Sequence, residues 1–217
     1  MNVIVFHPDE ELCRMLESEM VRQPDVTVLP ASYEELADSG LLDGAAVVVP
    51  GNGFGIMDGG LAAAAEQEND GLQRRVQTLI AKLYGVEMPV GAALILPVRS
   101  GHVLYAPTMQ VPMDITGTDN VYRAARAAAR MAKNNKVGTL YLPLMGCGAG
   151  GMEPLAAVWQ MLCGVYDGTQ VVTADELTWA HADRLHLQWH EMLGIPDDGY
   201  RFAEKMGAGD EDDSLED

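Results

Sequence analysis

Two glycine-rich segments are the parts of this sequence best suited to chemistry. The first, GNGFGIMDGG, spans residues 51–60, and the second, LMGCGAGGM, spans residues 144–152. Glycine allows a ligand to approach backbone N–H groups closely. A helix that begins directly after such a segment adds free N–H donors and a partial positive charge, which suits a phosphate. Together the two segments favour an anion or nucleotide site over mere turns, although turns use glycine as well.

Two common phosphate-binding motifs do not describe these segments. Neither contains GxxxxGK[ST], which excludes a Walker P-loop, and neither matches GxGxxG well enough to indicate a dinucleotide fingerprint. The chemical class of the anion therefore has to be inferred from other features of the chain.

Cysteine and histidine offer two further candidate sites. The three cysteines are widely spaced and include no CxxC pair, which predicts a reducing compartment and no disulfide framework. Cys147 lies in the second glycine segment without a histidine near it in sequence, so we interpret it as a small loop residue rather than a catalytic thiol. Asp183, His186 and His190 share one face of a predicted helix, and a metal-dependent hydrolase there remains an alternative to an ordinary helix face. No resident metal or cofactor is predicted.

The glycine segments lie between predicted strands and helices. Short apolar runs predict strands, and amphipathic runs predict helices. Strands are expected at 2–6, 26–29, 45–49, 92–97, 102–106, 139–142 and 170–173. Helices are expected at 9–22, after a capping box at Ser32 and Glu35, at 61–83 with a break near 69–71, and at 119–133, 154–162 and 174–193. This alternation predicts a layered α/β domain with a largely parallel or mixed sheet, in which ligands bind at the carboxyl ends of the strands.

Composition narrows the class of protein. The 217 residues include 32 acidic and 14 basic side chains, a net charge of −18, which argues against a nucleic-acid partner. No apolar run approaches the roughly 20 residues that span a membrane, so no membrane association is expected. The N-terminus lacks the pattern of a signal peptide, and we expect a cytoplasmic protein. The simplest domain organisation is one domain over 1–208 followed by a disordered acidic tail over 209–217. The oligomeric state is not predicted.

Four segments carry a resemblance to a known family. VVVPGNGFGIMDGG is similar to the first ligand loop of macro domains, and PLMGCGAGGMEP is similar to their second, diphosphate-binding loop. ASYEEL, APTMQVPMDI and GTDNVYRAA resemble a bacterial and phage branch of that superfamily. The resemblance covers about residues 1–165. It implies a three-layer α/β/α sandwich with a mixed central sheet and ADP-ribose, or a related small molecule, as the ligand.

The resemblance also implies roles for individual residues. Asn52 would contact the distal ribose, Phe54 would stack on the ligand or anchor the loop, and Asp58, Gly59 and Gly60 would shape the first loop. The phosphates would be wrapped by the backbone N–H groups of the second loop, contributed by Gly146, Cys147, Gly148, Ala149, Gly150 and Gly151.

Two departures from the family pattern bear on catalysis. Many catalytic macro domains carry an acid two places after the paired glycines, where this chain has Ala62, and Ser32 stands where an acid often reads the adenine amino group. Hydrolysis of an ADP-ribosyl bond needs a group that orients or deprotonates a water. Asn52 and Asp58 are the candidates, so we rank ligand binding above hydrolysis. The alternative is a phage or bacterial interaction or structural protein that has kept the fold without the ligand.

Charge is also unusual around the expected site. Residues 51–60, 108–118 and 144–152 contain no Lys or Arg. A bound diphosphate would be held mainly by backbone N–H groups and a helix N-terminus, unless Arg99 or Arg123 reaches it.

Overall fold

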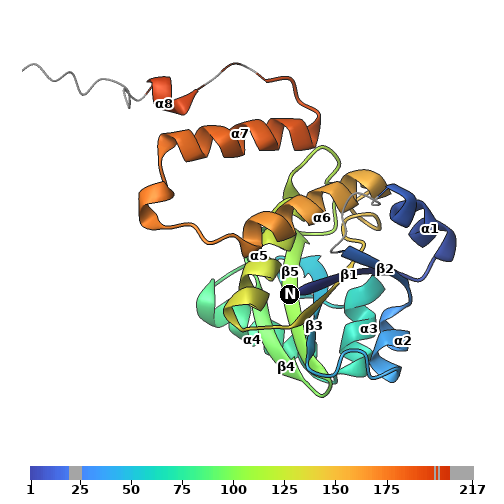
Figure 1. Cartoon of the computed structure of the whole chain (residues 1–217). Helices are drawn as coiled ribbons and strands as arrows, with labels where there is room; N and C mark the ends of the chain where they lie inside the picture. The colour runs from blue at the N-terminus through green and yellow to red at the C-terminus, as the bar shows by residue number, and fades with distance from the viewer. Residues whose placement is uncertain (20–25, 198, 200, 206–217) are drawn as a thin grey trace, which may run out of the picture. The chain divides into compact units, whose positions relative to one another are not determined.

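The structure, a computed structural model, describes residues 1–19, 26–197, 199 and 201–205 (Figure 1). The described chain forms two compact units, Met1–Thr169 and a unit that begins at Gln170. The predicted acidic tail and the predicted end of the first helix at residue 22 lie outside the described residues. The expectation of one domain over 1–208 stays a prediction.

One six-stranded sheet organises the first unit. Its strands are β1 (Asn2–His7), β2 (Val26–Pro30), β3 (Ala45–Asn52), β4 (Leu94–Val98), β5 (Gly101–Met109) and β6 (Thr139–Pro143). Their order is β2-β1-β6-β3-β5-β4, and all neighbours are parallel except β4 and β5, which form an antiparallel hairpin. The sheet is therefore mixed, as predicted.

Helices cover both faces of the sheet. The first unit contains α1 (Glu10–Glu19), α2 (Tyr33–Asp38), α3 (Gly60–Glu68), α4 (Leu72–Leu83), α5 (Asn120–Asn134) and α6 (Pro154–Thr169). Because side chains alternate along a strand, Ala46 and Val48 of β3 pack toward α5 and α6, while Val47 and Val49 pack toward α2, α3 and α4. These two apolar layers confirm the three-layer α/β/α architecture, whose helices Figure 1 shows on the two sides of the sheet.

Close helix packing holds α5 against α6. Helix α5 presents an alanine-rich buried face. A Cβ added at Gly164 of α6 would lie 2.5 Å from the backbone oxygen of Tyr122, and one at Gly168 would lie 2.5 Å from that of Arg126. Glycine at both positions allows the backbones of α5 and α6 to approach closely. The second glycine loop directly precedes α6, so this packing fixes the helix to which the loop is attached.

The second unit differs from the prediction at its start. Residues 170–173 form no strand: Val171 and Val172 are exposed and have no sheet partner. The predicted helix over 174–193 begins instead as a short 3-10 turn, η1 (Ala174–Glu176), and continues as α7 (Trp179–Leu193), with Thr178 as its N-cap, followed by α8 (Phe202–Lys205). Valine pairs favour strands only where a neighbouring strand accepts them.

Candidate functional site

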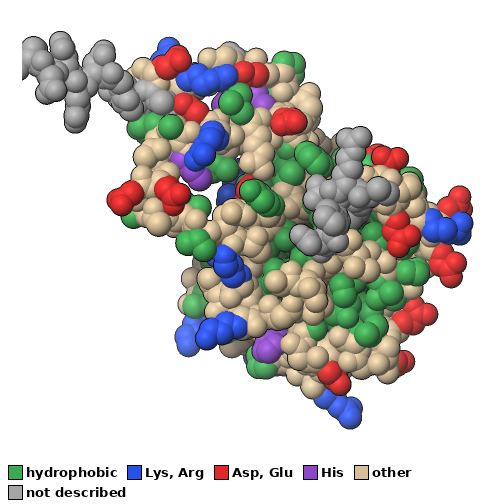
Figure 2. All heavy atoms as spheres, viewed as in Figure 1, with side chains coloured by type: hydrophobic (Ala, Val, Ile, Leu, Met, Phe, Trp, Pro, Cys, Tyr) green, Lys and Arg blue, Asp and Glu red, His purple; other side chains and the backbone are tan. Residues whose placement is uncertain are grey.

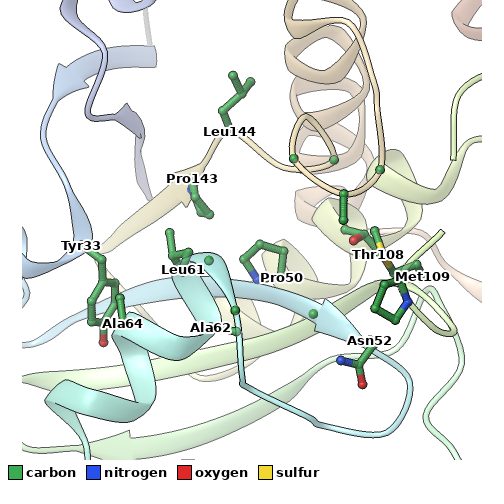
Figure 3. A pocket seen from close by; sticks show the side chains of 18 of the residues that line it. Tyr33, Pro50, Asn52, Leu61, Ala62, Ala64, Thr108, Met109, Pro143 and Leu144 are labelled. Atoms are coloured by element: carbon green, nitrogen blue, oxygen red, sulfur yellow. The ribbon is translucent and has the colours of Figure 1, made fainter. Parts of the chain in front are cut away.

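A cleft of about 570 Å³ lies at the carboxyl ends of the parallel strands. Because β3 and β6 are neighbours in the sheet, the two glycine loops that follow them lie side by side at this edge. Figure 3 shows Tyr33 and Ala64 toward one end of the cleft and Thr108 and Met109 toward the other, with Pro50 between them. The structure thus brings together two segments that lie about 90 residues apart in the sequence.

Eight of the predicted site residues line the cleft and three do not. The lining residues are Asn52, Asp58, Gly59, Gly60, Gly146, Gly148, Ala149 and Gly150. Phe54, Cys147 and Gly151 belong to the same loops but are not among the residues that line it.

The Asn52 side chain organises the first loop. Its Oδ1 accepts hydrogen bonds from the N–H groups of Phe54 (3.0 Å) and Ile56 (3.2 Å), and its Nδ2 donates to the Ile56 carbonyl (2.8 Å). The amide therefore spends most of its hydrogen-bonding capacity on the loop itself, which leaves one Nδ2 hydrogen for a ligand.

Helix α3 directs its N-terminus at the cleft. Its N-cap is Gly59, which has no side-chain oxygen to occupy the first amides, and its first turn contains no acid. Gly60 has a φ of 55°, a left-handed conformation that favours glycine. Leu61 and Ala62 of the first turn line the cleft, so free N–H donors and the positive end of the helix dipole face it. The exposed Asp58 is the carboxylate of this loop.

The glycines of the second loop divide into two kinds. Gly146 (φ 82°) and Gly150 are needed for packing, because a Cβ at Gly146 would lie 2.7 Å from Val121 Cγ2 and one at Gly150 would lie 2.5 Å from the Gly146 oxygen. Gly148 has an ordinary φ, and a Cβ there would meet nothing within 4 Å. Its Cβ position is therefore open space beside the cleft that it lines.

The amides of the second loop are available to a ligand. The loop is held by hydrogen bonds from the Gly151 N–H to the Gly148 oxygen and from the Met152 N–H to the Gly146 oxygen, both 3.0 Å. Within the described residues, the N–H groups of 147–150 donate to no protein acceptor. Unpaired N–H groups in a tight loop form an anion-binding concavity.

Cys147 lies beside these amides as a protonated thiol. Its Sγ donates to the Met145 oxygen (3.7 Å), and burial raises the thiol pKa to about 11. A nucleophilic cysteine needs a lowered pKa, so this environment agrees with our interpretation of Cys147 as a loop residue.

The end of the cleft beside Tyr33 contains residues that no motif in the sequence had indicated. His7, Tyr33 and Glu34 line it, beside Ser32. The Ser32 side chain accepts a hydrogen bond from the Glu35 N–H, and the Glu35 carboxylate accepts one from the Ser32 N–H, which confirms the predicted capping box. His7 directly follows a predicted strand, so the rule that ligands bind at carboxyl ends was the available signal for it.

The charged groups around the cleft are mostly acidic. The carboxylates of Glu34 and Asp58 line it together with the His7 imidazole, and no Lys or Arg is among its lining residues. Arg123 instead forms an ion pair with Asp119 on its own helix (2.7 Å). Figure 2 shows acidic side chains gathered over the edge formed by α1 and α2. An anion in the cleft would therefore meet no Lys or Arg side chain among the lining residues.

On the helix face that was an alternative metal site, the two histidines contact each other and a backbone carbonyl. The rings of His186 and His190 lie 4.3 Å apart, tilted against each other, and His190 Nδ1 lies 2.9 Å from the Pro196 oxygen. In the described ranges, no three His, Cys, Asp or Glu side chains are placed to hold a metal ion.

The helices within the described ranges include none that is long and apolar enough to cross a membrane.

Sequence comparisons give two distant relatives. No family model matches the chain. A 115-residue stretch is 35% identical to an uncharacterized protein of Aeropyrum pernix and covers 50% of this chain and 56% of that protein. A 141-residue stretch is 28% identical to an uncharacterized protein of Aquifex aeolicus and covers 64% and 79%, respectively. The chain thus matches little more than half the length of the first relative.

Solved structures with a similar fold include macrodomains. A mutant macrodomain of Oceanobacillus iheyensis superposes with a TM-score of 0.52 at 16% identity, covering 70% of this chain and 90% of that one. Another mutant of that macrodomain, with ADPR, gives 0.51 at 16% identity over 69% and 89%. Thermosipho africanus DarTG in complex with ADP-ribose gives 0.50 at 16% identity over 75% and 50%. This chain therefore has a macrodomain-like fold.

Proposed function

We propose that the first unit binds ADP-ribose, or a related nucleotide diphosphate, in the cleft between the two glycine loops. The observation that carries this proposal is the convergence of two sets of free backbone amides, those of the cleft-lining residues 148–150 and those of the first turn of α3. Because β3 and β6 are neighbours, both sets act on the same part of the cleft. Such amides bind phosphate without a basic side chain.

The extent of the cleft fits a ligand longer than a mononucleotide. Its lining reaches from Ser32, after β2, to Thr108, in β5. These strands are four places apart in the sheet, which corresponds to about 19 Å at the usual strand spacing. A diphosphate held centrally by the loops leaves room for one ring system on each side. The volume of about 570 Å³ falls within the range of small-molecule sites.

The comparisons support the same ligand class. Two of the similar structures, the O. iheyensis mutant with ADPR and the T. africanus complex with ADP-ribose, have ligands of this class. The open cleft also favours the proposal over an interaction protein that has kept the fold and lost its ligand, since in such a protein side chains would be free to fill the cleft.

Hydrolysis of an ADP-ribose derivative is the second candidate function, and Asp58 is the observation that favours it. This carboxylate belongs to the first glycine loop and lines the cleft, and a carboxylate can accept a proton from an attacking water. Ala62 offers no such group, and Asn52 is committed to the loop. We therefore place binding first.

Isothermal titration calorimetry with ADP-ribose tests the proposal. We expect saturable 1:1 heat for ADP-ribose and weaker heat for AMP, which lacks the diphosphate. Absence of heat and of a thermal shift at millimolar ADP-ribose would sink the proposal. Incubation of the chain and its Asp58→Asn variant with an ADP-ribosylated peptide separates the two functions. Release of ADP-ribose by the native chain, lost in the variant, would establish hydrolysis.

A further inference from the structure

The strand that carries the first loop ends in an irregular way. In the pairing of β3 with β5, Gly51 lies opposite Pro107 and Asn52 lies opposite Met109, so the register shifts between Gly51 and Asn52. The recorded pairing of β3 with its other neighbour, β6, is limited to Ala46 and Val47. The backbone N–H and C=O of Asn52, beyond the register shift, therefore need a partner outside the regular ladder.

Tyr105 supplies that partner. Its hydroxyl donates to the Asn52 oxygen (2.7 Å) and accepts from the Asn52 N–H (3.1 Å). One side chain thus holds both backbone polar groups of the residue at which β3 ends. The Tyr105 ring is completely buried in the layer between the sheet and α2–α4, so water cannot replace the hydroxyl there.

Gly51 provides the space for this contact. Tyr105 lies beside Val49 in register, and its ring extends along β3 across Gly51. A Cβ at Gly51 would lie 2.2 Å from the Tyr105 hydroxyl oxygen and 2.6 Å from the ring carbon that bears it. Any larger residue would displace the tyrosine. The first glycine of the loop is thus explained by the tyrosine beneath it rather than by a ligand above it.

We propose that Tyr105 is a positioning residue for the ligand site. Its hydroxyl fixes the backbone of Asn52 and therefore the position of the Asn52 side chain. That side chain forms the three hydrogen bonds that shape the loop as far as Ile56. Asn52 and Ile56 both line the cleft. Tyr105 itself does not line it and acts through Asn52. The effect on ligand affinity rests on the proposed function.

Other anchors make the effect local. The Gly53 N–H donates to the Gln110 oxygen, the Met88 N–H donates to the Gly53 oxygen, and the Met57 N–H donates to Gln73 Oε1. These bonds flank the segment 54–56 and remain when the hydroxyl is removed. A Tyr105→Phe variant therefore keeps the fold and releases the part of the loop that Asn52 controls.

The test compares Tyr105→Phe with Tyr122→Phe. Tyr122 also has a hydroxyl in a side-chain hydrogen bond, to Asp167 Oδ2 (2.8 Å), but it links α5 to α6 and does not line the cleft. For each variant we would measure the Kd for ADP-ribose, the urea midpoint, and the amide exchange of Phe54 and Ile56 by NMR. We expect Tyr105→Phe to raise Kd at least fivefold and to speed both amides about tenfold, while Tyr122→Phe changes neither.

Each result bears on the proposal. An unchanged Kd and unchanged exchange in Tyr105→Phe would overturn it, as would an equal loss of affinity in both variants, which would indicate general destabilisation. If the native chain failed to bind ADP-ribose, the proposed function would fail, yet the exchange measurement would still decide whether Tyr105 positions the loop. Slow exchange retained in Tyr105→Phe would refute that role.

Discussion

Gly148 offers a direct way to block the cleft without disturbing the fold. Its φ is ordinary and a Cβ there would meet nothing within 4 Å, so a Gly148→Ile variant places its side chain in open space. Replacing glycine reduces the conformational freedom of the unfolded chain, which changes the free energy of unfolding by less than about 1 kcal/mol at such a position. The branched side chain nevertheless occupies the approach to the amides of 148–150, which we propose hold the phosphates.

The expected loss of affinity follows from the contacts removed. A hydrogen bond from a backbone N–H to a charged acceptor contributes about 1.5–3 kcal/mol. Displacement of the ligand from two such donors costs about 3–6 kcal/mol, which raises Kd by a factor of about 100 or more. Most of this loss comes as faster dissociation.

Gly138 provides the matched control. It directly precedes β6, whereas Gly148 follows the carboxyl end of that strand. A Cβ at Gly138 also meets nothing within 4 Å, and its φ is ordinary. We expect calorimetry with ADP-ribose to show the native Kd for Gly138→Ile and no measurable heat for Gly148→Ile, with closely similar urea midpoints. A Gly148→Ile variant that binds within threefold of the native chain would refute the assignment of the second loop to the phosphates.

Three further predictions concern charge, cysteine chemistry and helix packing. Raising NaCl from about 0.05 M to about 0.3 M should strengthen ADP-ribose binding in calorimetry, because screening relieves repulsion between the anion and a chain of charge −18; a steep fall would mean that a Lys or Arg reaches the ligand. Burial raises the pKa of the Cys147 thiol to about 11. Its alkylation rate, followed by mass spectrometry, should therefore still increase with pH above about pH 10. A rate that reaches a plateau near pH 9 would contradict the burial. Gly164→Ala should cost about 1–3 kcal/mol in urea unfolding, because its Cβ meets the Tyr122 oxygen at 2.5 Å; stability equal to that of Gly138→Ala would disprove the tight packing.

Local sequence signals predicted the first unit well because they coincide with its tertiary contacts. The β-branched run over 45–49 is buried on both faces, and the Ser32–Glu35 capping box is made within one turn. The failure at 170–173 has the same origin. Val171 and Val172 have strand propensity but no neighbouring strand, and propensity without pairing forms no sheet.

The candidate site was predicted as two loops, but its geometry was not. The neighbouring positions of β3 and β6, which bring the loops together, are a property of the topology. The glycines could not be sorted by sequence either: Gly146 and Gly150 are constrained by packing, and Gly148 is open. The role of Tyr105 depends on a register shift 53 residues away, which no local pattern encodes.

The two outer strands of the sheet have a consequence for solubility. β2 ends at Pro30, and β4, at the other edge, contains Pro97, whose carbonyl accepts a hydrogen bond from Arg75 Nη2 (2.5 Å). A proline cannot donate to an added strand, and an occupied carbonyl is a poorer acceptor for one. Both exposed edges are thus interrupted at a backbone position. This arrangement makes the two outer strands of a sheet rich in valine and leucine poorer templates for a strand from another molecule.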